Sequence, residues 1–421
     1  MKNIAIIGSG ISGLTCAYML KQKYNISVFE QNDYIGGHTA TKDIEYQGDK
    51  QAIDTGFIVF NDRTYPLFEK LLAQIGVKRQ ATEMSFSVKN TLNGLEYNGN
   101  NLNSLFAQRS NLFNFKFWRL LSEILRFNRL CKTLMAEQLL DETTSLGQFL
   151  QDHEFSDYFS EQYILPMGAA IWSCSLDAML EFQLQFFVRF FDHHGLLNIN
   201  DRPQWYVIPG GSKQYIAPLT ASFKDDIHLN ANIQSVTRDV HGATLTFADG
   251  SEQQFDEVVL CCHSDQALKL LKDATAKETE VLGAIPYTNN DVVMHTDISL
   301  LPKRKLAWAA WNYLLNGQNH QSATVTYNMN ILQGLTSEHT YCVTLNQNQE
   351  IDPNKIIGRY QYAHPVFDIQ SQKARAKRDT ICGHNHTHFA GAYWYNGFHE
   401  DGVRSAVNVA NRLGCFLEQQ E

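Results

Sequence analysis

The first residues whose types and spacing indicate chemistry are three glycines, Gly8, Gly10 and Gly13. They follow a short apolar run at 3–7 and precede an apolar stretch at 14–20 that is typical of a helix. In such a loop the first glycine permits a tight turn, the second lets the backbone approach a pyrophosphate, and the third lets helix and strand pack closely. The helix N-terminus then offers free N–H groups to the phosphates. The spacing predicts a dinucleotide-binding strand–loop–helix unit.

An acidic residue stands where such a unit needs one. A second apolar run at 26–29 ends at Glu30, 22 residues after Gly8. A carboxylate there can accept hydrogen bonds from the adenosine ribose hydroxyls and would repel the 2′-phosphate of NADP. The prediction depends on strand, helix and acid all being in place, because the glycine pattern alone is a weak signal. The alternative is a tight strand–helix turn without a ligand.

A second glycine turn follows at Gly36 and Gly37, with His38 and Thr39 after it. A glycine doublet at this distance resembles the flavoprotein extension of the fingerprint, in which a second loop approaches the FAD pyrophosphate and ribityl chain. Glycine pairs are also common in ordinary turns.

The rest of the chain supplies the elements that must position this unit. We expect strands within 40–60, a helix over 64–76, and a mostly helical, Phe- and Trp-rich stretch from about 100 to 200. Further strands are predicted at 232–238, 243–247, 257–262, 291–295, 322–329, 341–345 and 388–391, and a last helix at 401–413. This order predicts an α/β protein. Its nucleotide-binding domain is assembled from 1–80, 203–275 and 355–421, and a second, α+β domain from 81–202 and 276–354.

Composition bounds the classes of function. A chain of 421 residues with 44% hydrophobic and 19% charged residues is globular and predicts two or three domains. A net charge of −9 argues against nucleic-acid binding, and no apolar run reaches the length of a membrane span. The eight cysteines form no CxxC pair, so neither a disulfide framework nor a zinc site is indicated, and we expect a cytoplasmic protein.

Four motifs occur in order: the N-terminal fingerprint with its glycine doublet, Asp54-Thr55-Gly56, Pro209-Gly210-Gly211-Ser212, and Phe389-Ala390-Gly391-Ala392 followed by Gly397-Phe398-His399-Glu400-Asp401-Gly402. In these motifs the chain resembles the flavin-containing amine oxidase superfamily, which includes monoamine oxidases, protoporphyrinogen oxidase and phytoene desaturases. The resemblance implies FAD as cofactor and a Rossmann-like FAD-binding domain interleaved with a substrate domain, the two-domain architecture of amine oxidases and p-hydroxybenzoate hydroxylase.

Within that superfamily, the chain most resembles bacterial predicted NAD/FAD-binding proteins that are often encoded beside cyclopropane-fatty-acid-synthase-like enzymes. Some of those are linked to desaturation of methylated lipid acyl chains. The closer resemblance is carried by Asp54 to Asn61, Leu165 to Ser173, Ala309 to Tyr313, Val325 to Tyr327, His364 to Phe367 and Gly397 to Gly402.

The resemblance also assigns cofactor contacts. The pyrophosphate would lie against Gly8, Gly10, Ile11, Ser12 and Gly13, and the adenine ribose against Glu30 and Gln31. The phosphate–ribityl path would be lined by Gly36, Gly37, His38 and Thr39, and the isoalloxazine ring would lie over Gly56, Phe57 and Ile58. Adenine would meet the backbone of Ile233, and the ribityl or phosphate groups would meet Gly391 and Ala392. N–H groups at the start of the last helix would face the N1–C2=O edge of the flavin, from Phe398, His399 and Glu400.

The chain departs from the family pattern in three places. His38 stands where an arginine is usual, and Ala392 replaces an acidic residue. The predicted strand after Pro286 has no lysine, although many amine oxidases place one near flavin N5. The missing lysine weakens an amine-oxidation reading.

No catalytic residue can be assigned from the sequence, because the chain shows no plausible Ser/His/Asp set and no activated cysteine. His384, His386 and His388 alternate, so a strand would place them on one face at the spacing of metal ligands. We favour solvated or hydrogen-bonded histidines there, and no metal. Cys261 and Cys262 end a buried run and are interpreted as packing residues.

The aromatic residues of the second domain are interpreted mostly as core. A subset is expected to line an apolar substrate site, and the candidates for its flavin-facing wall are Trp172, Trp311 and Tyr327.

The segment 105–135 combines six Lys or Arg residues, against the single acid Glu123, with many apolar and aromatic residues. Such a basic amphipathic helix is typical of a peripheral membrane contact. The alternative is an ordinary amphipathic helix whose arginines pair with acidic residues elsewhere on the surface.

Together these observations predict an FAD-dependent oxidoreductase that removes hydride from a carbon of a hydrophobic substrate, a methylated or cyclopropanated acyl chain being favoured. Its electron acceptor would be O2 or a quinone, and it would be associated functionally with a cyclopropane-synthase-like methyltransferase. A peripheral contact at the inner face of the membrane is an additional expectation. The alternatives are an oxidase of a soluble amine and a non-catalytic FAD-containing partner of such a methyltransferase. NAD is the less favoured cofactor.

Overall fold

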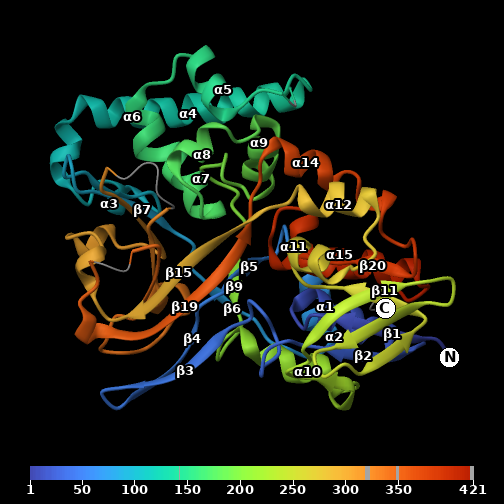
Figure 1. The fold of residues 1–421 in the computed structure, drawn as a ribbon. Helices are drawn as coiled ribbons and strands as arrows, with labels where there is room; N and C mark the ends of the chain where they lie inside the picture. Colours follow the sequence, from blue (N-terminus) through green and yellow to red (C-terminus); the bar gives the residue numbers. More distant parts are fainter. Residues whose placement is uncertain (142, 318–322, 348–349, 418–421) are drawn as a thin grey trace.

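A parallel five-stranded sheet forms the centre of the half of the molecule that contains both termini (Figure 1). The computed structural model describes residues 1–141, 143–317, 323–347 and 350–417. The sheet has the order β10-β2-β1-β14-β20, and every neighbouring pair is parallel. Its strands are β1 (Asn3–Ile7), β2 (Asn25–Phe29), β10 (Ile227–His228), β14 (Glu257–Leu260) and β20 (Thr387–Phe389). Strands from three distant parts of the chain therefore meet in one sheet, and β1 and β14 are apolar because both faces are covered.

Two helices from opposite ends of the chain, α1 (Ile11–Leu20) and α15 (His399–Arg412), pack together beside this sheet. α15 begins two residues before the predicted start at 401, because the carboxylate of Asp401 caps its first turn by accepting the N–H of Phe398 at 2.9 Å. Nearby, α2 (Pro66–Gln74) confirms the helix predicted at 64–76.

An antiparallel meander covers the sheet near Phe29, whose ring contacts Phe247 and Phe255. It consists of β11 (Ile233–Arg238), β12 (Ala243–Phe247) and β13 (Glu252–Phe255). The strands predicted at 232–238 and 243–247 are confirmed, and Gly250 lies in the turn between β12 and β13 with a φ of +82°.

The other half of the molecule is built on a mixed seven-stranded sheet in the order β19-β15-β18-β17-β16-β7-β8. Its strands are β7 (Phe86–Asn90), β8 (Glu96–Asn98), β15 (Tyr287–His295), β16 (Trp311–Leu315), β17 (Val325–Asn328), β18 (Cys342–Leu345) and β19 (Ile356–Pro365). Residue 322, where the strand ending at 329 was predicted to begin, lies outside the described residues. β15 and β19 pair along nearly their whole length, from Tyr287↔Pro365 to His295↔Ile356. The predicted boundary at 355 was therefore wrong for β19, because it separated this strand from the sheet to which it is hydrogen-bonded.

A helical layer covers one end of the seven-stranded sheet and lies at the top of Figure 1. As predicted for 100–200, it is built from α3 (Leu102–Leu105), α4 (Phe115–Ala136), α5 (Leu146–Asp152), α6 (Asp157–Phe159), α7 (Leu165–Trp172), α8 (Leu176–Leu180) and α9 (Leu184–His193). Its apolar faces form a core rich in phenylalanine, which includes Phe117, Phe127, Phe159, Phe187 and Phe191.

The remaining strands and α-helices are short. They are the hairpin β3 (Thr41–Tyr46) with β4 (Asp49–Asp54), the sheet β5 (Phe60–Asn61), β9 (Trp205–Val207) and β6 (Gln80–Thr82), and the helices α10 (Ile216–Thr220), α11 (Ser264–Leu270), α12 (Ala276–Gly283), α13 (Met329–Leu332) and α14 (Ile369–Arg375). Among the described residues, no helix is both long and apolar enough to cross a bilayer.

Candidate functional site

The glycine loop has the shape of a phosphate cradle. Gly8 adopts φ +105°, and a Cβ on Gly13 would lie 1.9 Å from the carbonyl oxygen of Gly8, so side chains are excluded at both positions. A Cβ on Gly10 would meet nothing within 4 Å. Open space above Gly10, next to the N-terminus of α1, is what a pyrophosphate needs.

The glycine doublet closes onto the same loop. The N–H of Gly36 donates to the carbonyl of Ser9 at 3.0 Å, and Gly36 forms an isolated bridge with Gly10. Gly37 adopts φ +57°, and a Cβ there would lie 3.2 Å from the Cα of Gly10. The two glycine turns, predicted separately, thus form one backbone surface.

Glu30 lies at the end of β2, buried, with both carboxylate oxygens in use. It accepts the N–H and hydroxyl of Ser9 at 3.0 and 2.5 Å, and the N–H and side-chain amide of Asn32, both at 2.9 Å. A ribose hydroxyl at this carboxylate would therefore replace the Ser9 hydroxyl or the Asn32 amide. Ile233 lies close by, since Ala231 donates its N–H to the Glu30 carbonyl at 2.8 Å, whereas Gln31 is exposed.

The start of α15 lies against the glycine loop. The Ser12 hydroxyl donates to the Gly402 carbonyl at 3.0 Å, and a Cβ on Gly402 would approach within 3.9 Å of the Cβ of Ala392. The first N–H groups of a helix have no partner within it, and those of His399 and Glu400 have none among the described residues, so they are available as donors here. The side chain of Glu400 is committed elsewhere, because it accepts the N–H groups of Leu67 and Phe68 at the start of α2, at 3.0 and 2.8 Å.

The imidazole of His399 has a positioning role that the sequence did not reveal. It stacks on Phe57, with ring centroids 3.5 Å apart, and its Nε2 lies 2.9 Å from the Tyr215 hydroxyl. Tyr215 in turn is hydrogen-bonded to Thr39. Burial holds the pKa of His399 well below its ordinary value, so the ring is neutral. This network fixes Thr39 and Phe57, two of the predicted cofactor contacts, against α15.

A cluster of three histidines, which we call the histidine cluster (His38, His263 and His364), lies where β15 and β19 reach the nucleotide-binding half. The ring of His38 lies 5.6 Å from that of His364 and 6.0 Å from that of His263. Burial, with smaller contributions from the neighbouring histidines, lowers the pKa of His38 to about 3 and that of His364 to about 4. All three are neutral at pH 7, since the pKa of His263 is also lowered by burial.

The Nε2 atom of His38 is buried and has no hydrogen-bond partner in the described structure. An unpaired buried ring nitrogen is costly, so this atom marks a place where a polar group is missing. The backbone carbonyl of the same residue lies beside Gly56, where a Cβ would come 2.2 Å from that oxygen. The unpaired ring nitrogen and the open space at Gly10 are compatible with a bound flavin dinucleotide. The cluster could not be found in advance because its members come from three separate segments.

The predicted aromatic wall is partly brought together. Trp311 and Tyr327 are directly opposite on β16 and β17, with ring centroids 5.0 Å apart, and both pack against a core that includes Ile58. Trp172 belongs to the phenylalanine-rich core of the helical layer, against which Trp311 and Tyr327 also pack, and its ring lies 4.8 Å from that of Phe190. The ring of Phe190 stacks on that of Phe398, the residue before α15, with centroids 5.2 Å apart. The helical layer therefore also reaches the predicted flavin edge.

The histidines at 384–388 do not form one face of a strand. Asn385 and His386 adopt φ values of 48° and 55° in a turn, and only His388 lies in β20. His388 approaches Glu257 at 3.5 Å. Within the described ranges, no group of three or more His, Cys, Asp or Glu side chains is arranged to hold a metal ion.

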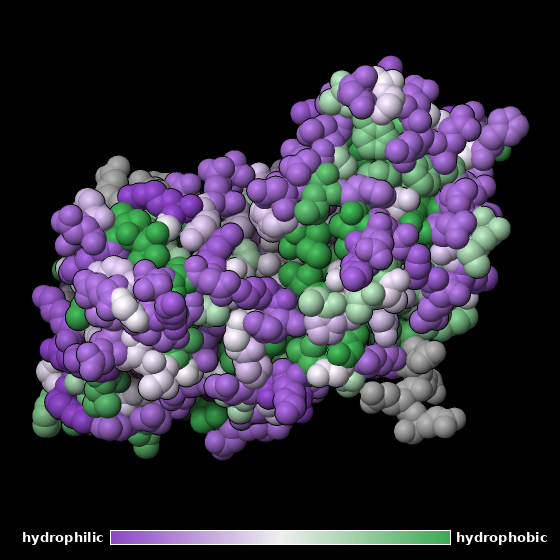
Figure 2. Space-filling view, turned by 90° about the horizontal axis from the view of Figure 1, so that it is seen from below, coloured by the Kyte–Doolittle hydropathy of each residue, from purple (hydrophilic) through white to green (hydrophobic). Residues whose placement is uncertain are grey.

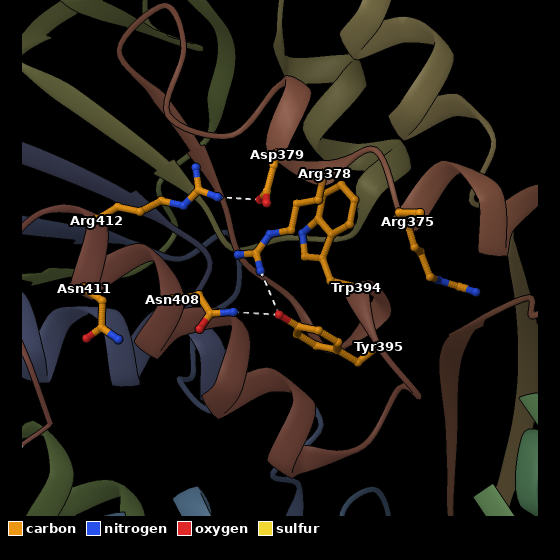
Figure 3. A pocket seen from close by; sticks show the side chains of 9 residues that line it. Arg375, Arg378, Asp379, Trp394, Tyr395, Asn408, Asn411 and Arg412 are labelled. Carbon is orange, nitrogen blue, oxygen red and sulfur yellow. Dashed lines mark hydrogen bonds and ion pairs between the residues drawn. The ribbon is translucent and has the colours of Figure 1, made fainter. Parts of the chain in front are cut away.

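A polar pocket of about 370 Å³ lies behind α15 (Figure 3). Its residues are Arg375, Ala376, Arg378, Asp379, Trp394, Tyr395, Asn408, Asn411 and Arg412. Arg378 donates to the carbonyls of Phe389 and Ser405 at 2.8 and 3.0 Å, so it ties β20 to α15. At about 100° per residue, Asn411 lies on the face of α15 opposite Gly402, which turns this pocket away from the glycine loop. The residues of this pocket therefore stabilise the packing of α15 and do not face the glycine loop.

Comparison with known proteins agrees with this geometry. Residues 11–319 match the family model described as flavin containing amine oxidoreductase. A 38-residue segment is 63% identical to the 1-hydroxycarotenoid 3,4-desaturase of Flavobacterium sp. (strain P99-3), covering 9% of this chain and 8% of that protein.

Solved structures share the fold along the whole chain. A putative protoporphyrinogen oxidase from Exiguobacterium sp. 255-15 has a TM-score of 0.71 at 18% identity, and a CLA-producing fatty acid isomerase from P. acnes has 0.69 at 14%; each comparison covers 98% of both chains. Cyclohexylamine oxidase from Brevibacterium oxydans IH-35A has 0.67 at 15%, covering 98% of this chain and 99% of that one. FAD is the cofactor that these matches and the glycine cradle support, and the protein is an FAD-dependent oxidoreductase. The chain thus belongs to the flavin-containing amine oxidoreductase family.

Proposed function

We propose that the protein desaturates a hydrophobic substrate, a methylated or cyclopropanated fatty acyl chain of a lipid. The substrate would lose a hydride from one carbon and a proton from its neighbour, leaving a double bond. When bound, FAD supplies the two-electron acceptor for this step. The chain's own residues need to bind an apolar chain, orient one C–H bond and exclude water.

The observation that carries the proposal is that no buried carboxylate in the described part of the chain is free to receive a cationic substrate. Each one already accepts hydrogen bonds from the protein; the acids are Glu30, Asp54, Glu96, Glu123, Glu278, Asp297, Glu400 and Asp401. A protonated amine placed among them would have to compete with these donors for the carboxylate oxygens, and burying a charge without a partner is expensive. An uncharged substrate carries no such penalty.

The wall that faces the predicted flavin position is aromatic. Trp311 and Tyr327 pack with Ile58 on one side, and Phe398 and Phe190 stack on the other. The indole N–H groups of Trp311 and Trp172 are buried without acceptors among the described residues, so a ligand that offers an oxygen, such as an acyl ester carbonyl, would satisfy one of them. Apolar walls with a few polar groups are typical of sites for apolar ligands.

The similar proteins support the same substrate class without identifying the substrate. One is named as a fatty acid isomerase and another as a carotenoid desaturase. We further propose that O2 or a quinone takes the two electrons and two protons, and that a cyclopropane-synthase-like methyltransferase supplies the substrate.

An anaerobic titration tests the proposal. The purified holoenzyme is mixed with a lipid extract from bacteria that carry such a methyltransferase, and separately with a panel of amines, while flavin absorption is followed. We expect bleaching by the lipid extract and none by the amines. Brisk bleaching by an amine would replace the proposal with amine oxidation, and a flavin that neither set reduces would favour a non-catalytic partner of the methyltransferase.

A further inference from the structure

One surface of the helical layer exposes aromatic side chains that core packing does not explain. Phe113 and Phe115 flank the N-terminus of α4 and are 87% and 90% exposed, and Trp118, one turn later, is 49% exposed. Leu112 beside them is 44% exposed. We call these four residues the aromatic tip.

The aromatic tip is not the face of α4 that packs into the core, because a different face of this helix is buried. Phe117, Leu120 and Phe127 of the same helix are fully buried in the phenylalanine-rich core. The Trp118 indole N–H donates to the Leu112 carbonyl at 2.9 Å, so the tip is held in its exposed arrangement. Contiguous exposed aromatic residues indicate an interaction site.

Basic side chains lie beside the tip and farther along α4, and in the described part of the chain only one of them has an acidic partner. The six in this segment are Arg109, Lys116, Arg119, Arg126, Arg129 and Lys132, and all are exposed. Among the ion pairs between described residues, only Arg119 has a carboxylate partner, Glu123, at 3.5 Å on the same helix. The alternative in which these arginines pair with an acidic surface elsewhere therefore finds no support in the described contacts.

We propose that the aromatic tip and these basic residues dock the protein on the surface of an anionic phospholipid bilayer. The rings of Phe113, Phe115 and Trp118 would enter the interface between headgroups and acyl chains, and Lys116 and Arg119 would meet lipid phosphates. Charge complementarity favours a bilayer, because a positive segment in a chain of net charge −9 is attracted to a negative surface while the rest is not. α4 lies along the outer edge of the molecule (Figure 1), and hydrophilic residues dominate the face seen from below, away from α4 (Figure 2).

The docking surface is connected to the aromatic wall of the site. Phe127 of α4 contacts Phe187 of α9, and Phe190 on the same helix stacks on Phe398. A protein held on the bilayer by α4 would keep the helical layer, and with it this wall, toward the lipid. This inference goes beyond the proposed substrate, and its test measures membrane binding alone, so the two can fail separately.

The test is co-sedimentation of the holoenzyme with vesicles of phosphatidylcholine alone or with 30 mol% phosphatidylglycerol, a composition of roughly the charge density that attracts basic segments. We expect binding to the anionic vesicles with a blue shift of tryptophan fluorescence. The double variant Phe113→Ser/Phe115→Ser should weaken binding at least about tenfold, and Lys116→Glu/Arg119→Glu should remove the preference for anionic lipid.

The matched control replaces an equally exposed apolar residue elsewhere, Val240→Ser, whose side chain is 85% exposed. It should bind vesicles like the wild type. Because all of these side chains lie at the surface, folding is checked by retained flavin absorption. Equal binding of the wild type and the Phe113/Phe115 variant, or capture by a partner protein without any vesicle binding, would overturn the proposal.

Discussion

The carboxylate of Asp54 accepts both the N–H and the hydroxyl of Ser212, at 2.9 and 2.8 Å, although the two residues are 158 positions apart. This contact joins two of the four family motifs. Gly211 adopts φ +91°, and a Cβ there would lie 2.3 Å from Thr41 Cγ2, so only glycine allows the loop to reach the carboxylate. Asp54 directly precedes Thr55 and Gly56, so the contact also fixes the segment that is predicted to lie under the isoalloxazine ring.

The burial of Asp54 predicts a pH-dependent stability. Burial raises the pKa of Asp54 to about 6, against smaller lowering contributions from Thr41 and Ser212. When folding raises the pKa of an acid, its protonated form adds to the free energy of unfolding. For Asp54 this stabilisation is complete below the pKa of the unfolded chain and is lost as the pH rises through 6. Asp54→Asn keeps an acceptor for the Ser212 N–H and should gain roughly 2 kcal/mol relative to wild type between pH 4 and pH 8. Denaturant unfolding at both pH values measures this, with the exposed Asp33→Asn as control; parallel curves for wild type and Asp54→Asn would contradict it.

Gly402 should tolerate no side chain. A Cβ there would come 2.6 Å from Ile11 Cγ2 and 3.1 Å from the Ser12 hydroxyl, so Gly402→Ala would push α15 away from the glycine loop. We expect FAD to dissociate at least about tenfold more readily, corresponding to roughly 1–3 kcal/mol of overpacking. Gly99→Ala, at a position where a Cβ meets nothing within 4 Å, is the control. Flavin-to-protein ratios after gel filtration compare the two, and full retention in Gly402→Ala would show that the contact does not shape the site.

His388 should stabilise the fold only below alkaline pH. Burial opposes its charge, but contacts with Cys382 and Glu257 raise its pKa to about 9. A raised histidine pKa contributes stability that is complete below about 6.5 and disappears as the pH rises through 9. His388→Gln should therefore lower the free energy of unfolding by on the order of 2 kcal/mol at pH 6 and by much less at pH 10. An equal loss at both pH values would assign His388 a packing role instead.

The histidine cluster should stay neutral where ordinary histidines titrate. The pKa of His38 is lowered to about 3 and that of His364 to about 4, so each contributes stability above its unfolded pKa that is lost as the pH falls toward these values. Histidine-selective NMR should show no titration of either ring between pH 5 and pH 8, and His38→Ala identifies its signal. A midpoint near 6.5 for His38 would mean that the cluster is open to solvent.

The aromatic wall should affect the substrate and leave FAD bound. Trp311→Ala would open space beside Tyr327 and Ile58, and we expect the rate of flavin reduction by the hydrophobic substrate to fall about tenfold or more at unchanged flavin content. Tyr327→Phe keeps the ring and should resemble the wild type. Stopped-flow reduction separates the variants, and an unchanged rate in Trp311→Ala would remove this residue from the site.

Local pattern was sufficient for the elements around the nucleotide-binding sheet. Neighbouring residues are enough to predict the strands at 3–7 and 25–29 and the glycine turns. Burial on both faces requires a run of apolar residues, and a positive φ favours glycine. The boundary at 355 was wrong because β19 alternates polar and apolar residues like many other strands, and only pairing with β15 shows which sheet it joins.

Contacts between distant segments were not predictable in this way. Glu400 was expected at the flavin edge, and its backbone begins α15 beside the glycine loop, yet its side chain caps α2, which depends on how two helices meet. The stacking of His399 on Phe57 and the histidine cluster likewise need the folded arrangement of three or more segments. Periodicity carries no information about such contacts.

The central claim is that an acyl chain loses two hydrogens at this site. The most direct measurement is the mass of the acyl chains after an anaerobic reaction with a known amount of holoenzyme. The account predicts one chain lighter by two hydrogens, with a new double bond, for each flavin reduced. Acyl chains of unchanged mass, in a sample whose flavin an amine reduces fully, would contradict it.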